Sequence, residues 1–464
     1  MFLNFFRDIG IVTSIVLCVI LVILFICLIK ALILRNKDIK ILPKNDVDKN
    51  VRFSYGKKLE ELVKIATTSN ETAEQYHEFR EKLKKEYPLI HQNFDKERID
   101  GNAVFTYKRK TEGAPNILYA THIDSKIILE EPYMTQKHLY GSGTYDAKAL
   151  LFVILEAIEN VLREDKVLNN NLTIVMTKDD EDSREGEDKI IDKFLREGKF
   201  FDLIIEEGSG IMDPISSGLR SHYAFIGIGV TGEVTFRFKT SKAAKGGARL
   251  QNFIFEISSS QIFKAKIDKQ TRMTIKAIAR DMTFSNRIIY SNSLVFRGLI
   301  KRFLDNDQVE LSRVLKTQAR VGEMLENDND YYVDVVFELA NHDNVAEVLC
   351  AIDKYMLKYS VEYEMIASKE GTRITSTKTK AYKTVTKVIK DNFDDIYIAP
   401  WIITSISENR EYDRVSDNVI RFSPLYYSHN AKINRKTNNE YVSLNSLAKG
   451  VSFFEKLTRE YSKR

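Results

Sequence analysis

The longest apolar stretch lies near the start of the chain. Residues 9–29 are apolar apart from Gly10, Thr13 and Ser14, and none of them is charged. A helix of about 20 apolar residues crosses the hydrocarbon core of a bilayer. A cleaved signal peptide has a shorter apolar region followed by a small-residue cleavage site, whereas basic residues follow here. The pattern therefore favours an uncleaved membrane anchor at 9–29, with a polar, basic tether at 30–52.

The side of the membrane that holds the rest of the chain stays open. Basic residues are more numerous after the anchor than before it, which by the positive-inside rule places the large domain in the cytoplasm. Asn70 and Asn171 begin triplets that fit the glycosylation sequon, which would suit the opposite side. Outside the anchor Cys350 is alone, so no intrachain disulfide is expected there.

Beyond residue 53 the pattern becomes that of a globular α/β protein. Apolar residues have helical spacing at 57–66 and at 72–87. From about residue 115, short apolar runs alternate with amphipathic stretches. This predicts helices at 147–162 and 189–196, and strands at 117–120, 172–177, 201–205 and 224–230. Such alternation is typical of a sheet with helices on both faces.

The pattern changes again after about residue 232. Residues 234–239 alternate like a half-exposed strand, a second strand follows at 331–337, and a helix is predicted at 345–359. Helical spacing returns near residue 377, and a further strand of the main sheet is expected at 396–404. We therefore expect a main α/β domain in two parts, 53–231 and 366–464, separated by an inserted α+β domain at 232–365.

Composition narrows the function only slightly. The 464 residues are 44% hydrophobic and 29% charged, which is ordinary for a globular protein. The formal net charge of +5 is small for this length, and the basic residues are interspersed with acids. The chain therefore has no basic footprint of the kind that binds nucleic acid.

Candidate chemistry gathers where the predicted strands end. His122 and Asp124 follow the first strand, and Asp146 ends the next glycine-rich turn. The acidic run 179–182 follows the second strand, and Glu206 follows the third together with Glu207. In α/β sheets ligands bind beyond the carboxyl ends of the strands, and carboxylate with imidazole suits zinc, manganese or cobalt. Acidic runs are more often solvated turns, but their recurrence at successive strand ends favours a metal site.

Several stretches carry a family resemblance, and they occur in the expected order: YATHIDS, LYGSGTYDAKALL, FDLIIEEGSGI, SNRIIYSNSLVF, DNVIRFSPL and NNEYVSLNSLAKGVSFF. The chain resembles, from about residue 57 to its end, the aminoacylase/carboxypeptidase family of co-catalytic zinc metallopeptidases. The branch is that of carboxypeptidase S and the membrane-anchored N-acyl-amino-acid hydrolases.

The resemblance implies a mixed-sheet α/β catalytic domain with helices on both faces, an inserted α+β lid or dimerisation domain, and an N-terminal transmembrane helix. It also implies one or two divalent ions such as Zn²⁺, a peptide or N-acyl amino acid as substrate, and a homodimer that this branch need not use.

The resemblance also assigns roles to individual residues. The metal ligands would be His122, Asp146, Glu181 and Glu206, with Asp146 bridging two ions and Glu206 standing where the family has an aspartate. Asp124 would orient the His122 ring, and Asp180 would be the general base. The frame of the run 179–182 is uncertain by one residue. Arg410 would bind the substrate's carboxylate, because its fork donates two hydrogen bonds.

Two positions depart from the family's pattern. Lys436 stands where the family has its last histidine ligand, and a protonated lysine cannot coordinate a cation. In the insert, Lys242 replaces a histidine that stabilises the reacting carbonyl oxygen, a role that its charge could also fill. The second metal position is therefore in doubt. Either His429 replaces the lost ligand, or Lys436 occupies the second ion's place as a fixed cation.

Three functions remain open. In the favoured one, the chain is a hydrolase in which a metal-activated water, deprotonated by Asp180, attacks an amide bond. In the second, the chain is a pseudo-peptidase that keeps the fold and acts as a binding or scaffolding protein. The third, a plain anchored structural protein, explains the fold but not the acids at successive strand ends.

Overall fold

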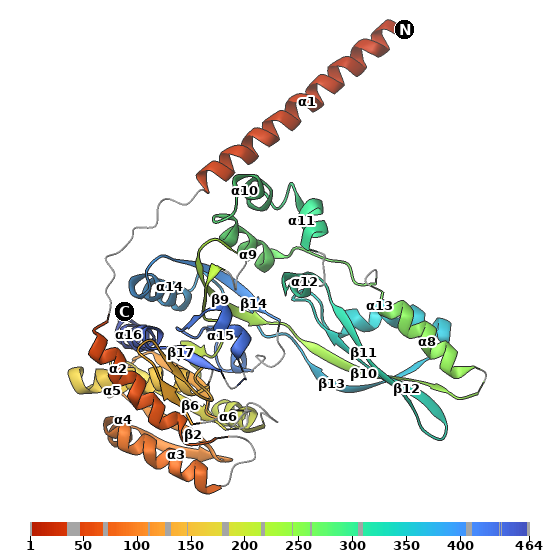
Figure 1. Cartoon of the computed structure of the whole chain (residues 1–464). Helices are drawn as coiled ribbons and strands as arrows, with labels where there is room; N and C mark the ends of the chain where they lie inside the picture. The colour runs from red at the N-terminus through yellow and green to blue at the C-terminus, as the bar shows by residue number, and fades with distance from the viewer. Residues whose placement is uncertain are drawn as a thin grey trace.

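The computed structural model describes residues 2–34, 47–67, 73–109, 112–125, 131–145, 147–178, 185–214, 219–243, 245–259, 262–304, 310–404, 411–435, 437 and 439–461. Helix α1 (Phe2–Ile33) extends away from the rest of the molecule (Figure 1). Its segment Val12–Ile33 is long and apolar enough to cross a membrane, by length and composition alone. A signal sequence would pass the same test.

A mixed sheet of ten strands forms the centre of the molecule, in the order β1-β2-β6-β3-β7-β15-β9-β8-β16, with β14 paired to β9. The strands are β1 (Asp95–Ile99), β2 (Asn102–Tyr107), β3 (Asn116–His122), β6 (Asn171–Thr177), β7 (Leu203–Glu206), β8 (Ile211–Met212), β9 (His222–Val230), β14 (Ile396–Ile403), β15 (Val419–Arg421) and β16 (Tyr426–Tyr427). The run β6-β3-β7-β15 is parallel, so its strands end at the same edge.

Helices cover both faces of this sheet, as the alternating pattern predicts. On one face lies α5 (Ala147–Asp165), whose residues from 147 to 162 are almost all buried, beneath α2 (Lys49–Val63) and α16 (Leu444–Glu460). On the other face α6 (Glu185–Arg196) packs Ile190, Ile191 and Phe194 against the strands. The remaining helices of this part are α3 (Ala73–Glu86), α4 (Pro88–Asn93), α14 (Lys380–Asn392), α15 (His429–Asn434) and the short 3₁₀ helix η2 (Tyr412–Arg414).

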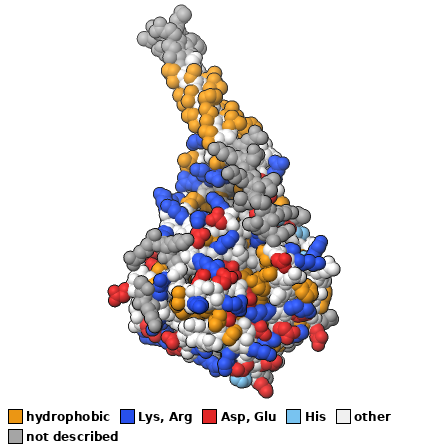
Figure 2. Space-filling model, turned by 90° about the vertical axis from the view of Figure 1, so that its left-hand side faces the viewer, with side chains coloured by type: hydrophobic (Ala, Val, Ile, Leu, Met, Phe, Trp, Pro, Cys, Tyr) orange, Lys and Arg blue, Asp and Glu red, His pale blue; other side chains and the backbone are white. Residues whose placement is uncertain are grey.

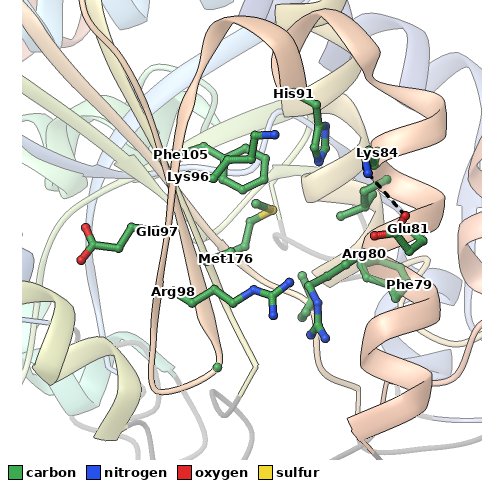
Figure 3. A pocket seen from close by; sticks show the side chains of 14 residues that line it. Phe79, Arg80, Glu81, Lys84, His91, Lys96, Glu97, Arg98, Phe105 and Met176 are labelled. Atoms are coloured by element: carbon green, nitrogen blue, oxygen red, sulfur yellow. Dashed lines mark ion pairs between the residues drawn. The ribbon is translucent and has the colours of Figure 1, made fainter.

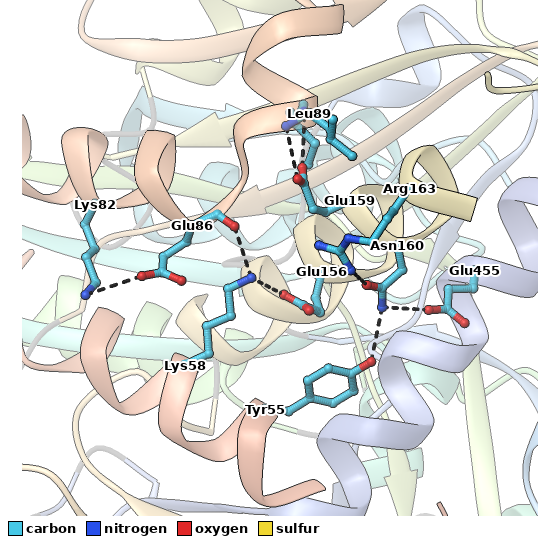
Figure 4. A network of polar contacts seen from close by, with 11 residues as sticks. Tyr55, Lys58, Lys82, Glu86, Leu89, Glu156, Glu159, Asn160, Arg163 and Glu455 are labelled. Carbon is cyan, nitrogen blue, oxygen red and sulfur yellow. Dashed lines mark hydrogen bonds and ion pairs between the residues drawn. The ribbon is translucent and has the colours of Figure 1, made fainter. Parts of the chain in front are cut away.

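Buried polar contacts join the helices above α5 (Figure 4). Lys58 of α2 forms an ion pair with Glu156 of α5 at 2.6 Å. Glu159, on the same helix, accepts hydrogen bonds from the backbone N–H groups of Leu89 and Ile90 at 3.0 Å each. The first turn of α4 is thus satisfied by a carboxylate from another helix, which fixes α4 on the core.

A second, antiparallel sheet with its own core extends to one side (Figure 1). Its order is β11-β12-β10-β13, and its elements are β10 (Glu233–Ser241), β11 (Gln318–Glu326), β12 (Asp330–Glu338), β13 (Glu362–Lys369), α8 (Gly246–Ile257) and α13 (Val345–Tyr359). The chain enters this sheet after Thr231 and leaves it at Glu370. Both crossings lie side by side, since Gly371 approaches Gly232 closely.

Two smaller groups complete the structure. Helices α9 (Lys269–Ala279), α10 (Phe284–Ser291), α11 (Arg297–Leu304) and α12 (Glu310–Leu315) lie between the two sheets and the end of α1 (Figure 1). A three-stranded sheet of β4 (Tyr133–Met134), β5 (His138–Tyr140) and β17 (Tyr441–Ser443) ties the C-terminal part of the chain to the turn after β5.

Candidate active site

The candidate site lies at the carboxyl edge of the parallel strands. His122 is the last residue of β3, which is flanked by β6 and β7. Glu206 ends β7, and Glu207 follows it. Because neighbouring parallel strands end at one edge, these side chains meet there, as the sequence predicts for His122 and the acids after β7.

His122 is held between two carboxylates. Its Nδ1 lies 3.1 Å from Oδ1 of Asp124, and its Nε2 lies 2.9 Å from Oε2 of Glu207. The His122 side chain is 3% exposed and Asp124 is fully buried. A neutral imidazole that donates from Nδ1 to Asp124 presents a lone pair at Nε2. The carboxylate of Asp124 behind Nδ1 is the arrangement in which proteins orient a histidine metal ligand.

Glu206 has a different environment from the one expected. Its Oε1 lies 2.6 Å from Nε of Arg421, and both side chains are fully buried. Arg421 stands directly opposite Glu206 in the β7–β15 pairing. Successive residues of an extended chain point to opposite sides, so Glu207, and not Glu206, reaches His122. The guanidinium group supplies to Glu206 the positive charge that a metal ion was expected to supply.

The glycine-rich turn before α5 is held from the C-terminal part of the chain. Gly143 has φ +80°, a left-handed conformation that favours glycine. The backbone N–H of Tyr145 donates to Oε1 of Glu440 at 2.8 Å. Tyr145 also stacks on Tyr427, with ring centroids 4.3 Å apart. Glu440, which is nearly buried, therefore fixes the backbone immediately before residue 146.

Five predicted site residues lie outside the described residues: Asp146, Asp180, Glu181, Arg410 and Lys436. Their roles, and the frame of the acidic run, stay predictions. Within the described ranges no group of three or more His, Cys, Asp or Glu side chains is arranged to hold a metal ion.

Two further candidates do not join His122 in the described structure. Lys242 follows the end of β10 that is farthest from the main sheet, where its Nζ lies 3.4 Å from Oε2 of Glu326. His429 is exposed at the start of α15, and its backbone N–H donates to Asp213 at 2.9 Å. In this arrangement of one chain, neither side chain contributes to the buried cluster.

A cavity of about 250 Å³ lies between α3, α4 and the β1–β2 hairpin (Figure 3). Its floor is apolar, and Ile123, the residue after His122, is part of its lining. Arg80 and Arg98 point toward each other across it (Figure 3). Burial, and then the charge of Arg98, lowers the pKa of Arg80. Among the described residues, neither Asp124 nor Glu206 lines this cavity.

Sequence reasoning did not assign Glu207, Arg421 and Glu440. Glu207 could have been found as the neighbour of Glu206 in the same acidic pair. Arg421 carries a clearer signal, since it is the one charged residue in the apolar run Val419–Phe422 that precedes Ser423 and Pro424. A charge in such a run needs a buried partner. Glu440 lies in a stretch quoted for the resemblance, but nothing in the sequence indicates which backbone it holds.

Comparisons with known proteins agree on one family. The model of peptidase family M20/M25/M40 matches residues 118–460. The zebrafish (Danio rerio) protein N-fatty-acyl-amino acid synthase/hydrolase PM20D1.1 is 23% identical over 85% of this chain and 83% of its own length. The probable carboxypeptidase S-like 2 of Dictyostelium discoideum is 21% identical over 84% of this chain and 79% of its own length.

Solved structures show the same fold. The M20 family metallo-carboxypeptidase Sso-CP2 from Sulfolobus solfataricus aligns with a TM-score of 0.61 at 16% identity, covering 88% of this chain and 99% of its own. Human carnosine dipeptidase 1 aligns with a TM-score of 0.58 at 13% identity, covering 89% and 96%. The resemblance found in the sequence and the mixed-sheet α/β fold are thereby confirmed. The chain belongs to peptidase family M20/M25/M40, and its enzyme class is that of the metallopeptidases and amidohydrolases.

Proposed function

We propose that this chain is a membrane-anchored, metal-dependent hydrolase of amide bonds in N-acyl amino acids or peptides, and that it works with one metal ion. The observation that carries the proposal is His122, buried between Asp124 and Glu207 with its Nε2 facing a carboxylate. The names of the relatives supply the substrate class, since one refers to N-fatty-acyl amino acids and another to a carboxypeptidase.

In this proposal the ion takes two of its donors from described residues. His122 and Glu207 would hold it, with Asp146 and Glu181 as the further predicted ligands. Imidazole nitrogen with carboxylate oxygen is the donor set that zinc takes in hydrolytic sites. When bound, the ion supplies Lewis acidity for the amide carbonyl and lowers the pKa of a water molecule.

Side chains of this chain position the histidine, accept the proton and bind the substrate. Asp124 accepts the Nδ1 proton of His122 and fixes the ring so that Nε2 points to Glu207. In the proposed reaction Asp180 accepts the proton from the attacking water, and Arg410 binds the substrate's carboxylate through two hydrogen bonds. Glu440 holds the backbone of Tyr145, the residue before Asp146.

A second ion does not fit the described residues. Arg421 already provides a fixed positive charge to Glu206 within 2.6 Å, and Lys436 replaces the histidine that the family uses there. A carboxylate whose charge is already balanced by a guanidinium group attracts a further cation only weakly. The same observation supports a second candidate function, a pseudo-peptidase that keeps the fold for binding or scaffolding without turnover.

Membrane anchoring is part of the proposal. It is supported by the length and composition of Val12–Ile33 and by the basic residues that follow it. Apart from Cys27 and Ala31, the described side chains of this helix are not buried by the rest of the chain. A lipid environment would cover them, and the uncleaved helix would hold the hydrolase at the membrane.

Turnover by single-histidine variants tests the proposal. The full-length chain is purified in detergent with zinc, and release of the free amino acid from N-acyl amino acids and dipeptides is followed by mass spectrometry. His122→Ala should abolish turnover, whereas His429→Ala, at an exposed histidine, should keep it. Wild-type protein without turnover on either substrate class would favour the pseudo-peptidase. Equal activity in His122→Ala would refute the proposed site.

A further inference from the structure

Helices α10 and α11, with the turn between them, expose an unusual number of large apolar side chains. Phe284, Leu294, Val295, Leu299 and Phe303 are 46, 71, 55, 39 and 55% exposed. They lie within about twenty residues of sequence, and we call them the α10–α11 surface. Scattered exposed apolar residues are ordinary, but a contiguous apolar surface marks an interaction site.

The surface is held on a packed base, so its outward direction is fixed. Ile300 and Leu304 of α11 are buried in a small core with Ile267, Ile275 and Leu315. On a helix, residues three or four apart share a face. Leu299 and Phe303 each precede one of these buried residues, so they lie about 100° around the helix from Ile300 or Leu304, on a flank of α11 that is exposed.

Basic residues lie among these apolar side chains. Arg297 and Arg302 are exposed, Lys301 is half-buried, and none of the three has an ion-pair partner within the described parts of the chain. Lys and Arg side chains also gather on the face just below the apolar helix in Figure 2. Apolar side chains mixed with unpaired cations are the composition of a segment that lies in the headgroup layer of an anionic membrane.

The surface is continuous with the proposed membrane anchor. The Nδ2 group of Asn292, in the turn after α10, donates to the backbone oxygen of Cys27 in α1 at 3.0 Å. Cys27 and Ala31 are 1% and 0% exposed, whereas the α1 residues before Cys27 whose side chains are described are all exposed. Figure 1 shows α10 and α11 close to the end of α1 that enters the rest of the molecule. The bilayer that surrounds α1 would therefore extend as far as α10 and α11.

We infer that the α10–α11 surface docks into the headgroup layer of the bilayer that α1 crosses, with its basic side chains on anionic lipid. The inference rests on the membrane anchoring in the proposed function. Its consequence is orientation, because a second point of contact beside α1 restricts how the two sheets can tilt relative to the membrane.

Depth-dependent quenching tests the inference on the full-length chain. The three native cysteines are changed to alanine, and an environment-sensitive fluorophore is attached to a single new cysteine. The chain is reconstituted in phosphatidylcholine vesicles with a minority of phosphatidylserine and nitroxide-labelled lipid. The fluorophore is placed by Leu294→Cys on the surface, by Val22→Cys within α1, and by Phe255→Cys as the control. Phe255 is 80% exposed on α8, distant from α1.

The expected result is strong quenching at position 22, several-fold quenching at 294, and almost none at 255. Changing Arg297, Lys301 and Arg302 together to Gln should weaken the quenching at 294 but not at 22. Quenching at 22 without quenching at 294 would overturn the inference and leave the anchor intact. No quenching at 22 would overturn both. A blue-shifted emission at 294 that lipid nitroxides do not quench would mean that protein, such as a second copy of this chain, covers the surface, and would also overturn it.

Discussion

Two adjacent glutamates with opposite environments define the site at the scale of single residues. Glu207 faces the imidazole of His122, and Glu206 faces the guanidinium group of Arg421. One carboxylate thus lies beside the imidazole, and the other is neutralised by a guanidinium group. This division is the structural reason for proposing a single metal ion.

The buried pair of Glu206 and Arg421 leads to a stability prediction. Removing one partner leaves the other charge buried without compensation, which costs about 3–5 kcal/mol, whereas replacing both with apolar residues costs much less. Glu206→Leu and Arg421→Met should each lower the denaturant midpoint of the full-length chain. The double variant should be more stable than either single variant. Additive losses would show that the two side chains do not act as a pair.

Asp124 gives a prediction for metal affinity. Its Oδ1 contacts Nδ1 of His122, the nitrogen that faces away from Glu207, so Asp124→Asn should keep the proposed ligands but loosen the ring and its protonation. Losing such a carboxylate behind a histidine ligand weakens metal binding by about 10–100-fold. Zinc competition against a chromophoric chelator measures this. The control is Asp281→Asn, at a buried aspartate that accepts from Ser221 at 2.9 Å. Equal zinc affinity in Asp124→Asn and the wild type would contradict the account.

The sequence predicted the edge of the sheet at which the site lies, but not which side chains contact one another there. Acids after successive apolar runs could be assigned to strand ends because parallel strands finish together. Alternation also implies that Glu206 and Glu207 point apart. It does not say which of them faces inward, because that depends on how β15 pairs with β7, more than two hundred residues away along the chain.

At the scale of elements, local patterns predicted most of the strands and helices around the site. The run 117–120 lies in β3, 172–177 in β6, and the helix predicted at 345–359 coincides with α13. The β1–β2 hairpin was not predicted, because its outer strand is almost entirely exposed and carries no alternation. Helices α9–α11 were not predicted either, since their apolar residues face both the protein and its exterior.

Helix α4 provides a prediction at this scale. It begins without a capping side chain of its own, and Glu159 of α5 accepts from Leu89 and Ile90 instead. Glu159→Leu should leave two N–H groups without an acceptor and cost about 1–3 kcal/mol for each. Glu159→Gln keeps one acceptor oxygen and should lose less. Hydrogen exchange of the α4 amides measures the effect. Unchanged exchange in Glu159→Leu would show that the carboxylate does not hold the helix.

At the scale of the whole molecule, two crossings join the two sheets. At this junction a Cβ on Gly232 would lie 2.6 Å from the backbone N of Gly371 and the backbone O of Lys369. The approach of two backbones explains the glycines there. The division into a catalytic domain at 53–231 and 366–464 and an insert at 232–365 stays a prediction.

A glycine pair tests how tightly this junction is packed. Gly232→Ala should force the crossings apart and cost about 1–3 kcal/mol, as overpacking does elsewhere. Gly298→Ala is the matched control, because a Cβ there has no atom within 4 Å, and it should leave stability unchanged or slightly higher. Thermal unfolding measures the stability of the two variants, and the rate of proteolysis at the junction measures how readily the crossings separate. Equal behaviour of the two variants would show that the crossings are loosely packed.

The number of metal ions per chain tests the central claim most directly. The full-length protein, purified with zinc in detergent and freed of loose metal by gel filtration, is analysed by mass spectrometry of its metal content. One ion per chain is expected, lost in His122→Ala and retained in His429→Ala. Two ions per chain would contradict the assignment of Glu206 to Arg421, and the absence of metal from the wild type would contradict the proposed hydrolase.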